Sequence, residues 1–309
     1  MNALDTLKSG GKRALADALN AIEAQAGEAS VTALLDEAYD APRGHVLGLT
    51  GPPGVGKSTL ISALIRALRD EGATVGVIAV DPSSRSSRGA LLGDRIRFVT
   101  DPADKGVFVR SMAARDRLGG LSEMTYPALV LMRALYDIVI VETVGVGQSE
   151  TDIADIADTV VLCAQPGSGD ALQFMKAGVM EIPDMVVVTK ADLGQLARRA
   201  VADLKGALSL AAGRRGSAAP QVLSCSASTG QGIAELAAAL LWRAGEGVDS
   251  GHRRVQGAHW LRTHLAEAFG REGVEKLRRA GLLGRESAPF GQATELASRF
   301  RRAIESAEL

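Results

Sequence analysis

This sequence has few aromatic residues and only two cysteines. It also lacks a marked excess of either charge and a long apolar run. Aromatic side chains make up only 4% of its 309 residues, so a core must consist mainly of Val, Ile, Leu and Ala, as in an α/β protein. Lysine and arginine total 35 against 36 acids, which argues against a dedicated nucleic-acid binder. No stretch could cross a bilayer, and the N-terminus lacks the apolar region of a signal peptide. We therefore expect a soluble, cytoplasmic protein that binds neither nucleic acid nor membrane.

The two cysteines, Cys163 and Cys225, lie in the apolar or small-residue segments VVLCA and VLSCSA. These settings favour buried thiols over a disulfide, in agreement with a reducing cytoplasm. Hydrophobic residues make up 46% of the chain, which is enough for one large core with smaller appendages.

Short apolar runs alternate with helical segments through the middle of the chain. The runs are continuously apolar, which indicates strands covered on both faces and hence a mostly parallel sheet flanked by helices. The predicted strands cover residues 45–50, 74–80, 106–110, 137–142, 159–164, 185–189 and 221–227.

Both ends of the chain have helical periodicity. The polar and glycine-containing stretch 244–254 resembles a linker, and two helices are expected after it. Leu296, Phe300 and Ile304 form a narrow stripe that predicts a helix–helix seam, either against the central domain or in a dimer. The predicted parts are an N-terminal helical extension (1–42), a central α/β domain (43–245) and a C-terminal helical arm (246–309).

The segment GPPGVGKS has the spacing G-x-x-x-x-G-K-[ST] between an apolar strand and an amphipathic helix. Its glycines let backbone N–H groups point at phosphate oxygens, and the helix N-terminus adds a positive dipole end. Lys57 is expected to neutralise the β- and γ-phosphates and Ser58 to ligate Mg²⁺. The pattern predicts a P-loop NTPase but does not choose between ATP and GTP. The residues expected at the phosphates are Gly51, Pro52, Pro53, Gly54, Val55, Gly56, Lys57, Ser58 and Thr59.

The tetrad TKAD at the end of a predicted strand indicates guanine. Asp192 can accept two hydrogen bonds from guanine, whereas adenine would leave this carboxylate partly unpaired. Lys190 would lay its aliphatic stem over the base, and Thr189 stands where asparagine is commoner. The later loop with Ser226 and Ala227 would present a backbone N–H to the guanine carbonyl oxygen. The sequence therefore predicts GTP and GDP as ligands.

Three carboxylates are expected near the phosphates. Asp81 and Glu142 end predicted strands, and Asp94 follows in the next loop region. Each alone is as well explained as a solvated loop acid. Together, at the carboxyl edge of a parallel sheet, they and Ser58 indicate a set that binds Mg²⁺ and positions water.

Glu142 also begins an E-x-x-G version of the D-x-x-G loop that senses the γ-phosphate, in which Gly145 would make the contact. Val146 follows this glycine where some GTPases place their water-orienting glutamine, so Gln148 is the remaining candidate. We expect slow hydrolysis by the protein alone and faster hydrolysis in a complex, since a group that a partner supplies or orders can contribute about 10³–10⁵-fold in rate. The predicted catalytic set is Lys57, Asp81, Asp94, Glu142 and Gln148.

Several longer segments carry a family resemblance. They are GLTGPPGVGKSTLI, AVDPSS, GALLGDRIR, VRSMAARDRLGGLS, VETVGVGQSETDIADIADTVV, PGSGDALQFMKAGVMEIPD and TKADL. From about residue 10 to its end the chain resembles the MeaB/ArgK-type G proteins, the GTPases associated with adenosylcobalamin-dependent methylmalonyl-CoA mutase. It departs from them at Thr189, where asparagine is usual, and at RSSRGA, where a Gly-Gly turn is usual.

The resemblance implies a G-protein chaperone for an adenosylcobalamin-dependent acyl-CoA mutase. Such a protein gates cofactor loading, protects or reactivates the mutase, and hydrolyses GTP faster when the partner is present. It also implies a homodimer formed through the C-terminal helices. The resemblance makes residues 165–178 a segment that relays the nucleotide state, whereas the residues alone fit a plain loop between a strand and a helix.

Two other functions fit part of the pattern. A P-loop kinase would use Asp81 or Asp94 as the acceptor base, but TKAD and the Ser226–Ala227 loop would then have no role. A metal-insertion GTPase needs a thiolate or imidazole cluster, and none of the four histidines pairs with a cysteine at ligand spacing.

Overall fold

The computed structural model divides into two compact units. One contains residues Gly44–Thr125 and Tyr136–Gly247, and the other contains Met1–Arg43, Tyr126–Leu135 and Val248–Leu309. The two helical ends of the chain therefore belong to one unit, which also includes a segment from the middle of the sequence. The structure describes residues 2–82, 98, 100–114, 124–143, 152–167, 182–215, 218–283 and 288–306.

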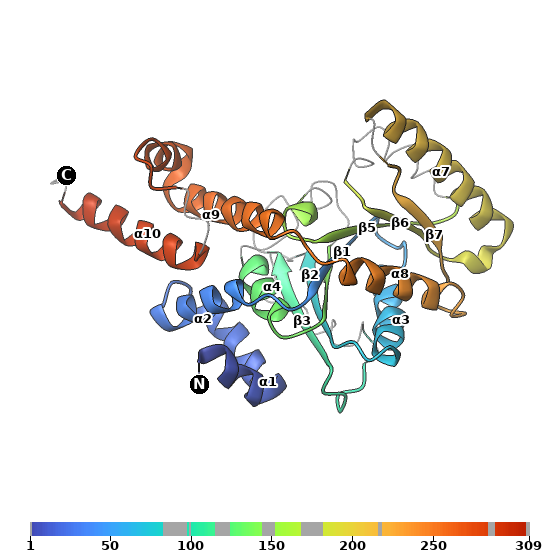
Figure 1. Ribbon diagram of the computed structural model, residues 1–309, viewed down its shortest axis with the longest axis horizontal. Helices are drawn as coiled ribbons and strands as arrows, with labels where there is room; N and C mark the ends of the chain where they lie inside the picture. Colours follow the sequence, from blue (N-terminus) through green and yellow to red (C-terminus); the bar gives the residue numbers. More distant parts are fainter. Residues whose placement is uncertain are drawn as a thin grey trace. The chain divides into compact units, whose positions relative to one another are not determined.

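A seven-stranded sheet forms the centre of the first unit, in the order β3-β2-β4-β1-β5-β6-β7 (Figure 1). Every neighbouring pair is parallel, so all strands end at the same edge. Each strand overlaps one predicted from an apolar run, which confirms the predicted parallel α/β sheet. The strands are β1 (His45–Thr50), β2 (Val75–Pro82), β3 (Val107–Ala114), β4 (Ile138–Glu142), β5 (Thr159–Ala164), β6 (Met185–Val188) and β7 (Gln221–Ser224).

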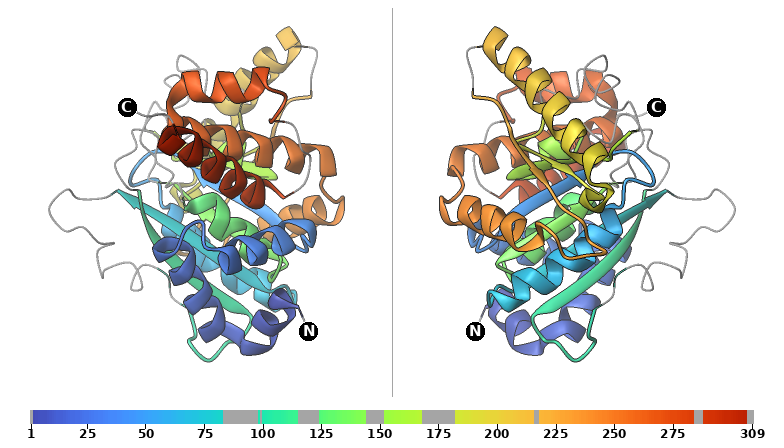
Figure 2. Two further views of the ribbon diagram at one scale, coloured as in Figure 1. Left: turned by 90° about the vertical axis from the view of Figure 1, so that its left-hand side faces the viewer. Right: turned by 90° about the vertical axis from the view of Figure 1, so that its right-hand side faces the viewer.

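Helices cover both faces of this sheet, because most of its strands have apolar side chains on both sides. On one face, α3 (Lys57–Asp70) and α8 (Ile233–Gly245) pack with Leu60, Leu64 and Leu236 against strand residues such as Val161. On the other face, α7 (Gln195–Arg215) packs Leu204 against the neighbouring strand residue Leu162. Figure 2 shows β2 and β3 running side by side at the edge of the sheet.

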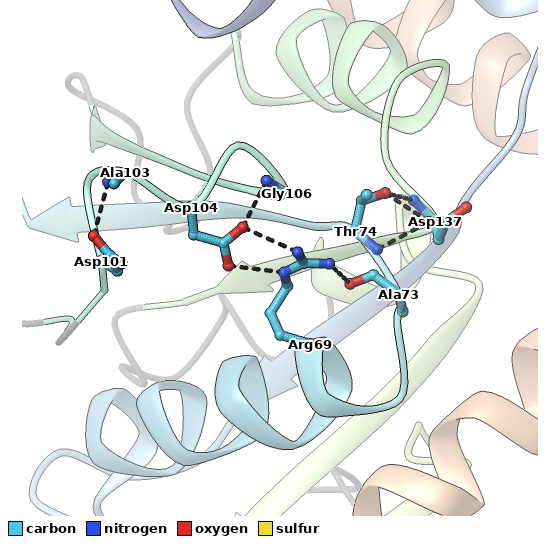
Figure 3. Close-up of polar contacts among 8 residues, drawn as sticks. All are labelled: Arg69, Ala73, Thr74, Asp101, Ala103, Asp104, Gly106 and Asp137. Carbon is cyan, nitrogen blue, oxygen red and sulfur yellow. Dashed lines mark hydrogen bonds and ion pairs between the residues drawn. The ribbon is translucent and has the colours of Figure 1, made fainter.

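Side chains tie together the loops at the edge where the strands begin (Figure 3). Arg69, in the last turn of α3, donates through Nε and Nη2 to the two carboxylate oxygens of Asp104, at 2.8 and 3.0 Å. Asp137, just before β4, accepts from the backbone N–H and the hydroxyl of Thr74, at 2.9 and 2.6 Å. We call this set of loops, with Arg69, Thr74, Asp104 and Asp137, the amino edge.

The second unit is helical. Asp36 accepts hydrogen bonds from the backbone N–H groups of Phe290 and Gly291, at 3.1 and 2.8 Å, so it caps the start of α10 from another helix. Burial raises the pKa of this carboxyl group, although the two hydrogen bonds act in the opposite direction. The helices of this unit are α1 (Ala3–Ala24), α2 (Ala29–Asp40), most of α4 (Thr125–Arg133), α9 (Ser250–Arg279) and α10 (Pro289–Ser306).

Leu296 and Phe300 of the predicted C-terminal stripe pack within this chain, and the side chain of Ile304 lies outside the described residues. Leu296 is 3% exposed and lies in a cluster with Leu261, Leu265 and Leu277 of α9. The ring of Phe300 lies 4.3 Å from that of Phe269, centroid to centroid. The seam therefore exists, but it joins α10 to α9, which is neither of the two partners expected from the sequence.

The predicted linker 244–254 needs a correction. Residues from Ser250 onward are already helical, because Asp249 caps α9 by accepting a hydrogen bond from the N–H of Gly251 at 2.9 Å. Polar residues such as Asp249 are common both in linkers and at helix N-caps, so the sequence alone did not show that this residue starts a helix. None of the helices in the described part of the chain is long and apolar enough to cross a membrane.

Candidate functional site

The P-loop joins β1 to α3 through backbone conformations that require glycine. Gly51, Gly54 and Gly56 have φ values of +138°, +74° and +99°. A Cβ atom on Gly51 would lie 2.4 Å from the carbonyl oxygen of Cys163 in β5, so the loop also passes directly over that strand. Gly56 precedes the first residue of α3, and the curl therefore ends at a helix N-terminus.

Lys57 folds back over this loop. Its Nζ donates to the carbonyl oxygens of Gly51 at 2.7 Å and Pro52 at 3.1 Å, and the residue is 7% exposed. A buried ammonium must be hydrogen-bonded, and loop carbonyls meet that need in the absence of a stronger anion. The charge is thus held inside the curl formed by the predicted phosphate-binding residues.

Ser58 and Glu142 meet beside Lys57. The hydroxyl of Ser58 donates to Oε1 of Glu142 at 2.8 Å, and Glu142 is 3% exposed at the end of β4. The next residue, Thr143, donates its N–H to the carbonyl oxygen of Leu49 at 3.1 Å, which fixes the strand end against β1. A hydroxyl and a carboxylate are the oxygen ligands that Mg²⁺ prefers, so the pair fits the predicted metal.

The other predicted phosphate-side residues are only partly described. Asp81 lies in β2, paired in register with Ala113 of β3, but its side chain is outside the described part of the chain. Asp94, Gly145 and Gln148 also lie outside the described residues. Of the predicted carboxylates, the structure therefore brings Glu142 to Ser58 and leaves the roles of the others as predictions.

Thr189 ties the predicted base-reading loop to the P-loop. Its hydroxyl donates to the carbonyl oxygen of Val55 at 2.8 Å and lies 3.1 Å from that of Ala164. The backbone N–H of Thr189 also donates to the oxygen of Ala164, at 2.8 Å, and the residue is 4% exposed. The hydroxyl of threonine thus supplies a connection between β6, β5 and the P-loop.

Lys190 follows in a left-handed backbone conformation, with φ 56° and ψ 43°. This conformation is uncommon for a residue with a side chain. Its Nζ donates to the carbonyl oxygen of Gly54 at 3.2 Å and to Oε1 of Gln165 at 2.5 Å. The contact with Gln165 was not predicted from the sequence, which links this residue only to the segment 165–178 and not to Lys190.

Asp192 and the Ser226–Ala227 loop complete this side. Asp192 is exposed in the short helix η4 (Ala191–Leu193). The loop is closed on itself, since the N–H of Ser226 donates to the oxygen of Gln231 at 2.8 Å and Ser226 is 1% exposed. The N–H of Ala191 donates to the oxygen of Cys225 at 3.0 Å, which joins the two predicted base-reading loops.

Both thiols are buried, as the sequence indicates. Burial raises the pKa of Cys163 to about 12, and the nearby Lys57 ammonium opposes that shift only in part. Burial also raises the pKa of Cys225 to about 12. Neither group is a thiolate at neutral pH, so the cysteines pack the core beside the P-loop and do not act as nucleophiles.

The comparison with known families agrees with this geometry. A model of the family described as methylmalonyl-CoA mutase-associated GTPase MeaB matches residues 15–275. The chain belongs to the MeaB family. The MeaB/ArgK resemblance seen in the sequence is confirmed, and the prediction of a GTPase is confirmed at the level of this family.

Members and relatives of the MeaB family match over different lengths. GTPase ArgK of Escherichia coli is 36% identical over 292 residues, 90% of this chain and 88% of its own. The mitochondrial methylmalonic aciduria type A homolog of Mus musculus is 44% identical over 194 residues, 62% of this chain and 46% of its own. A crystal structure of a LAO/AO transport system kinase is 29% identical, covers 97% of this chain and 99% of its own, and has a TM-score of 0.65.

The match to some relatives covers only part of either chain. The chain spans 60% and 58% of two relatives from Pyrococcus horikoshii and Pyrococcus abyssi, in addition to the 46% of the mouse protein. Membership of the MeaB family therefore rests on the matched region, which contains the P-loop, Glu142 and TKAD.

Proposed function

We propose that this chain binds and hydrolyses GTP and serves as a chaperone for an adenosylcobalamin-dependent acyl-CoA mutase, with methylmalonyl-CoA mutase as the first candidate. The observation that carries the proposal is the MeaB family match across both units, with the P-loop, the Ser58–Glu142 pair and the Thr189–Lys190 turn at one sheet edge. The name of the mouse relative, which refers to methylmalonic aciduria, supports the choice of partner.

The phosphate side would work through charge and position. Lys57 would exchange the carbonyl oxygens of Gly51 and Pro52 for phosphate oxygens. Its positive charge is already in the site, so no charged group has to be moved there when the nucleotide binds. Ser58 and Glu142 would hold Mg²⁺, which when bound neutralises charge on the β- and γ-phosphate oxygens. Asp81, Asp94 and Gln148 keep their predicted roles at this side, as does Gly145 as a γ-phosphate contact.

The base side would be read by Asp192 and by the backbone near Ser226 and Ala227, with Lys190 against the ring. Guanine satisfies both acceptor sites of a carboxylate, and adenine does not. We also propose a homodimer that involves the C-terminal helices 246–309. Because Leu296 is used within the chain, the dimer contact would lie elsewhere on these helices, and light scattering at several concentrations tests it.

The test of function is GTP turnover by the purified protein, alone and with purified methylmalonyl-CoA mutase in apo and cofactor-loaded forms. We expect the protein by itself to release phosphate slowly and the turnover rate to rise at least about 10-fold when mutase is added. Groups that a partner orders contribute up to about 10³–10⁵-fold in rate in this class of reaction. Equal affinity for ATP and GTP, or turnover that no cobalamin-dependent mutase changes, would contradict the proposal.

A second candidate is transfer of the γ-phosphoryl group to an acceptor, because the solved structure at 29% identity is named a kinase. The same assay separates the two. With radiolabelled GTP, hydrolysis releases free phosphate, whereas a kinase leaves the label on an added acceptor or on the protein.

A further inference from the structure

We propose that Gln165 is a positioning residue for guanine recognition, which acts by holding the ammonium group of Lys190. The proposal rests on the GTP-binding function proposed above. Gln165 lies directly after β5, outside the P-loop, TKAD and the Ser226–Ala227 loop, and is the first residue of the segment 165–178, which was given no role in base recognition.

The ammonium group of Lys190 is bonded to two other residues, Gln165 and Gly54. Lys190 Nζ donates to Oε1 of Gln165 at 2.5 Å and to the carbonyl oxygen of Gly54 at 3.2 Å. A lysine ammonium has three donors on a flexible stem, so two acceptors on different loops select one direction for that stem. One of these acceptors is in the P-loop and the other follows a neighbouring strand.

The position of Gln165 is itself fixed by the sheet. Its neighbour Ala164 pairs in register with Val188 and accepts from both the N–H and the hydroxyl of Thr189. The ends of β5 and β6 are therefore joined one residue before Gln165 and Lys190. The amide oxygen of Gln165 is presented to Lys190 from a rigid strand end, which favours preorganisation over a chance surface contact.

The backbone of Lys190 gives an independent reason. A left-handed conformation at a residue other than glycine is unfavourable unless its surroundings support it. The contacts made by its ammonium group offset that cost and direct the side chain back toward Gly54. With the ammonium group held by acceptors on Gln165 and Gly54, the stem of Lys190 is ordered before the base arrives, so less ordering remains to oppose binding.

The experiment measures equilibrium affinity and dissociation rates for fluorescent GDP and GTP analogues. We expect Gln165→Ala and Gln165→Met to lower the affinity for both nucleotides by about 3- to 10-fold, mainly through faster dissociation. Gln165→Glu keeps an acceptor oxygen and should stay within about twofold of the wild type. Because the base is the same in GDP and GTP, KM for GTP should rise while kcat changes by less than about twofold.

The matched control is Gln221→Ala, at an exposed glutamine that begins β7. A double-mutant cycle with Lys190→Met, which keeps the stem and removes the ammonium group, tests the route of action. In that background Gln165→Ala should have no further effect.

Two results would overturn the proposal: Gln165→Ala and Gln165→Met binding GDP as tightly as the wild type, or an equal loss with and without the ammonium group of Lys190. Thermal unfolding of each variant accompanies the binding data, and Gln165→Met keeps the bulk of the side chain should alanine unfold the loop. A wild-type protein that fails to bind any guanine nucleotide contradicts the proposed function instead, so the two failures are distinguishable.

Discussion

The two edges of the same parallel sheet differ in how they use polar groups. At the amino edge, charged side chains are bonded to one another and to nearby loop N–H and C=O groups, as in the paired contacts of Arg69 with Asp104 (Figure 3). At the edge where the strands end, charged groups donate hydrogen bonds to backbone oxygens of the P-loop, as Lys57 and Lys190 do. A residue with a side chain, Lys190, has a positive φ value there.

The difference separates stability from binding. An Arg–carboxylate pair with two parallel hydrogen bonds is complete and gains nothing from a ligand. A lysine held by backbone carbonyls is satisfied but can exchange those neutral acceptors for phosphate oxygens, which bind it more strongly. We therefore expect substitutions at the amino edge to change stability with little effect on turnover, and substitutions at the other edge to do the reverse.

The largest expected effect comes from Lys57→Ala. Removing the ammonium group should lower GTP turnover by about 100-fold or more, because it would balance charge on the transferring phosphoryl group. The thermal midpoint of the nucleotide-free protein should fall by only a few degrees, because two carbonyl oxygens lose a donor but a buried charge is removed with it. Lys105→Ala, at an exposed lysine in the amino-edge loop, is the control, and equal turnover losses in the two variants would break the comparison.

Glu142→Gln should come next. Glutamine still accepts from Ser58 but loses the negative charge, so we expect about 10- to 100-fold weaker Mg²⁺ activation, measured as turnover against magnesium concentration. The control lies at the other end of the same strand, since Asp137 precedes β4 and Glu142 ends it. Asp137→Asn should lower the thermal midpoint without changing the magnesium dependence.

A smaller effect, of the opposite kind, is expected for Arg69→Met. The variant loses the contacts with Asp104 and with the carbonyl oxygen of Ala73, and should unfold with about 1–2 kcal/mol less free energy in denaturant titrations. GTP turnover should stay within about twofold of the wild type. A large loss of turnover with no loss of stability would mean that the two edges do not divide these tasks.

The smallest effect is expected for Thr189→Val, which keeps the volume and removes the hydroxyl bonded to Val55. We predict about 1 kcal/mol lower stability and a loss of a few-fold in GDP affinity, because one buried carbonyl oxygen loses a donor. Thr189→Ser restores the hydroxyl and should recover affinity. If valine binds GDP as tightly as threonine, the link between the base-reading loop and the P-loop is structural only.

Most of the fold was accessible from local pattern. Continuous apolar runs such as HVLGLT and TVVLCA became β1 and β5 with the predicted bounds, since a strand buried on both faces has no polar alternation to confuse it. The order of the strands was not accessible, because it depends on which distant segments pack together. The partner of the Leu296 stripe was missed for the same reason.

The site divides in a similar way. The P-loop and TKAD could be predicted because motifs of these kinds have fixed spacings, and such spacing is visible in a sequence. Gln165 lies 25 positions from Lys190 and meets it only because β5 and β6 are neighbours in the sheet. Contacts of this kind need the topology first.

That topology has one more consequence. Strand β1, which leads into the P-loop, lies between β4 with Glu142 on one side and β5, followed by β6 and Lys190, on the other. The identity of a bound nucleotide and the number of its phosphates would thus be sensed on opposite flanks of a single strand. Under the proposed function, loss of one phosphate would change contacts on the Glu142 flank, whereas the base contacts on the Lys190 flank would stay the same.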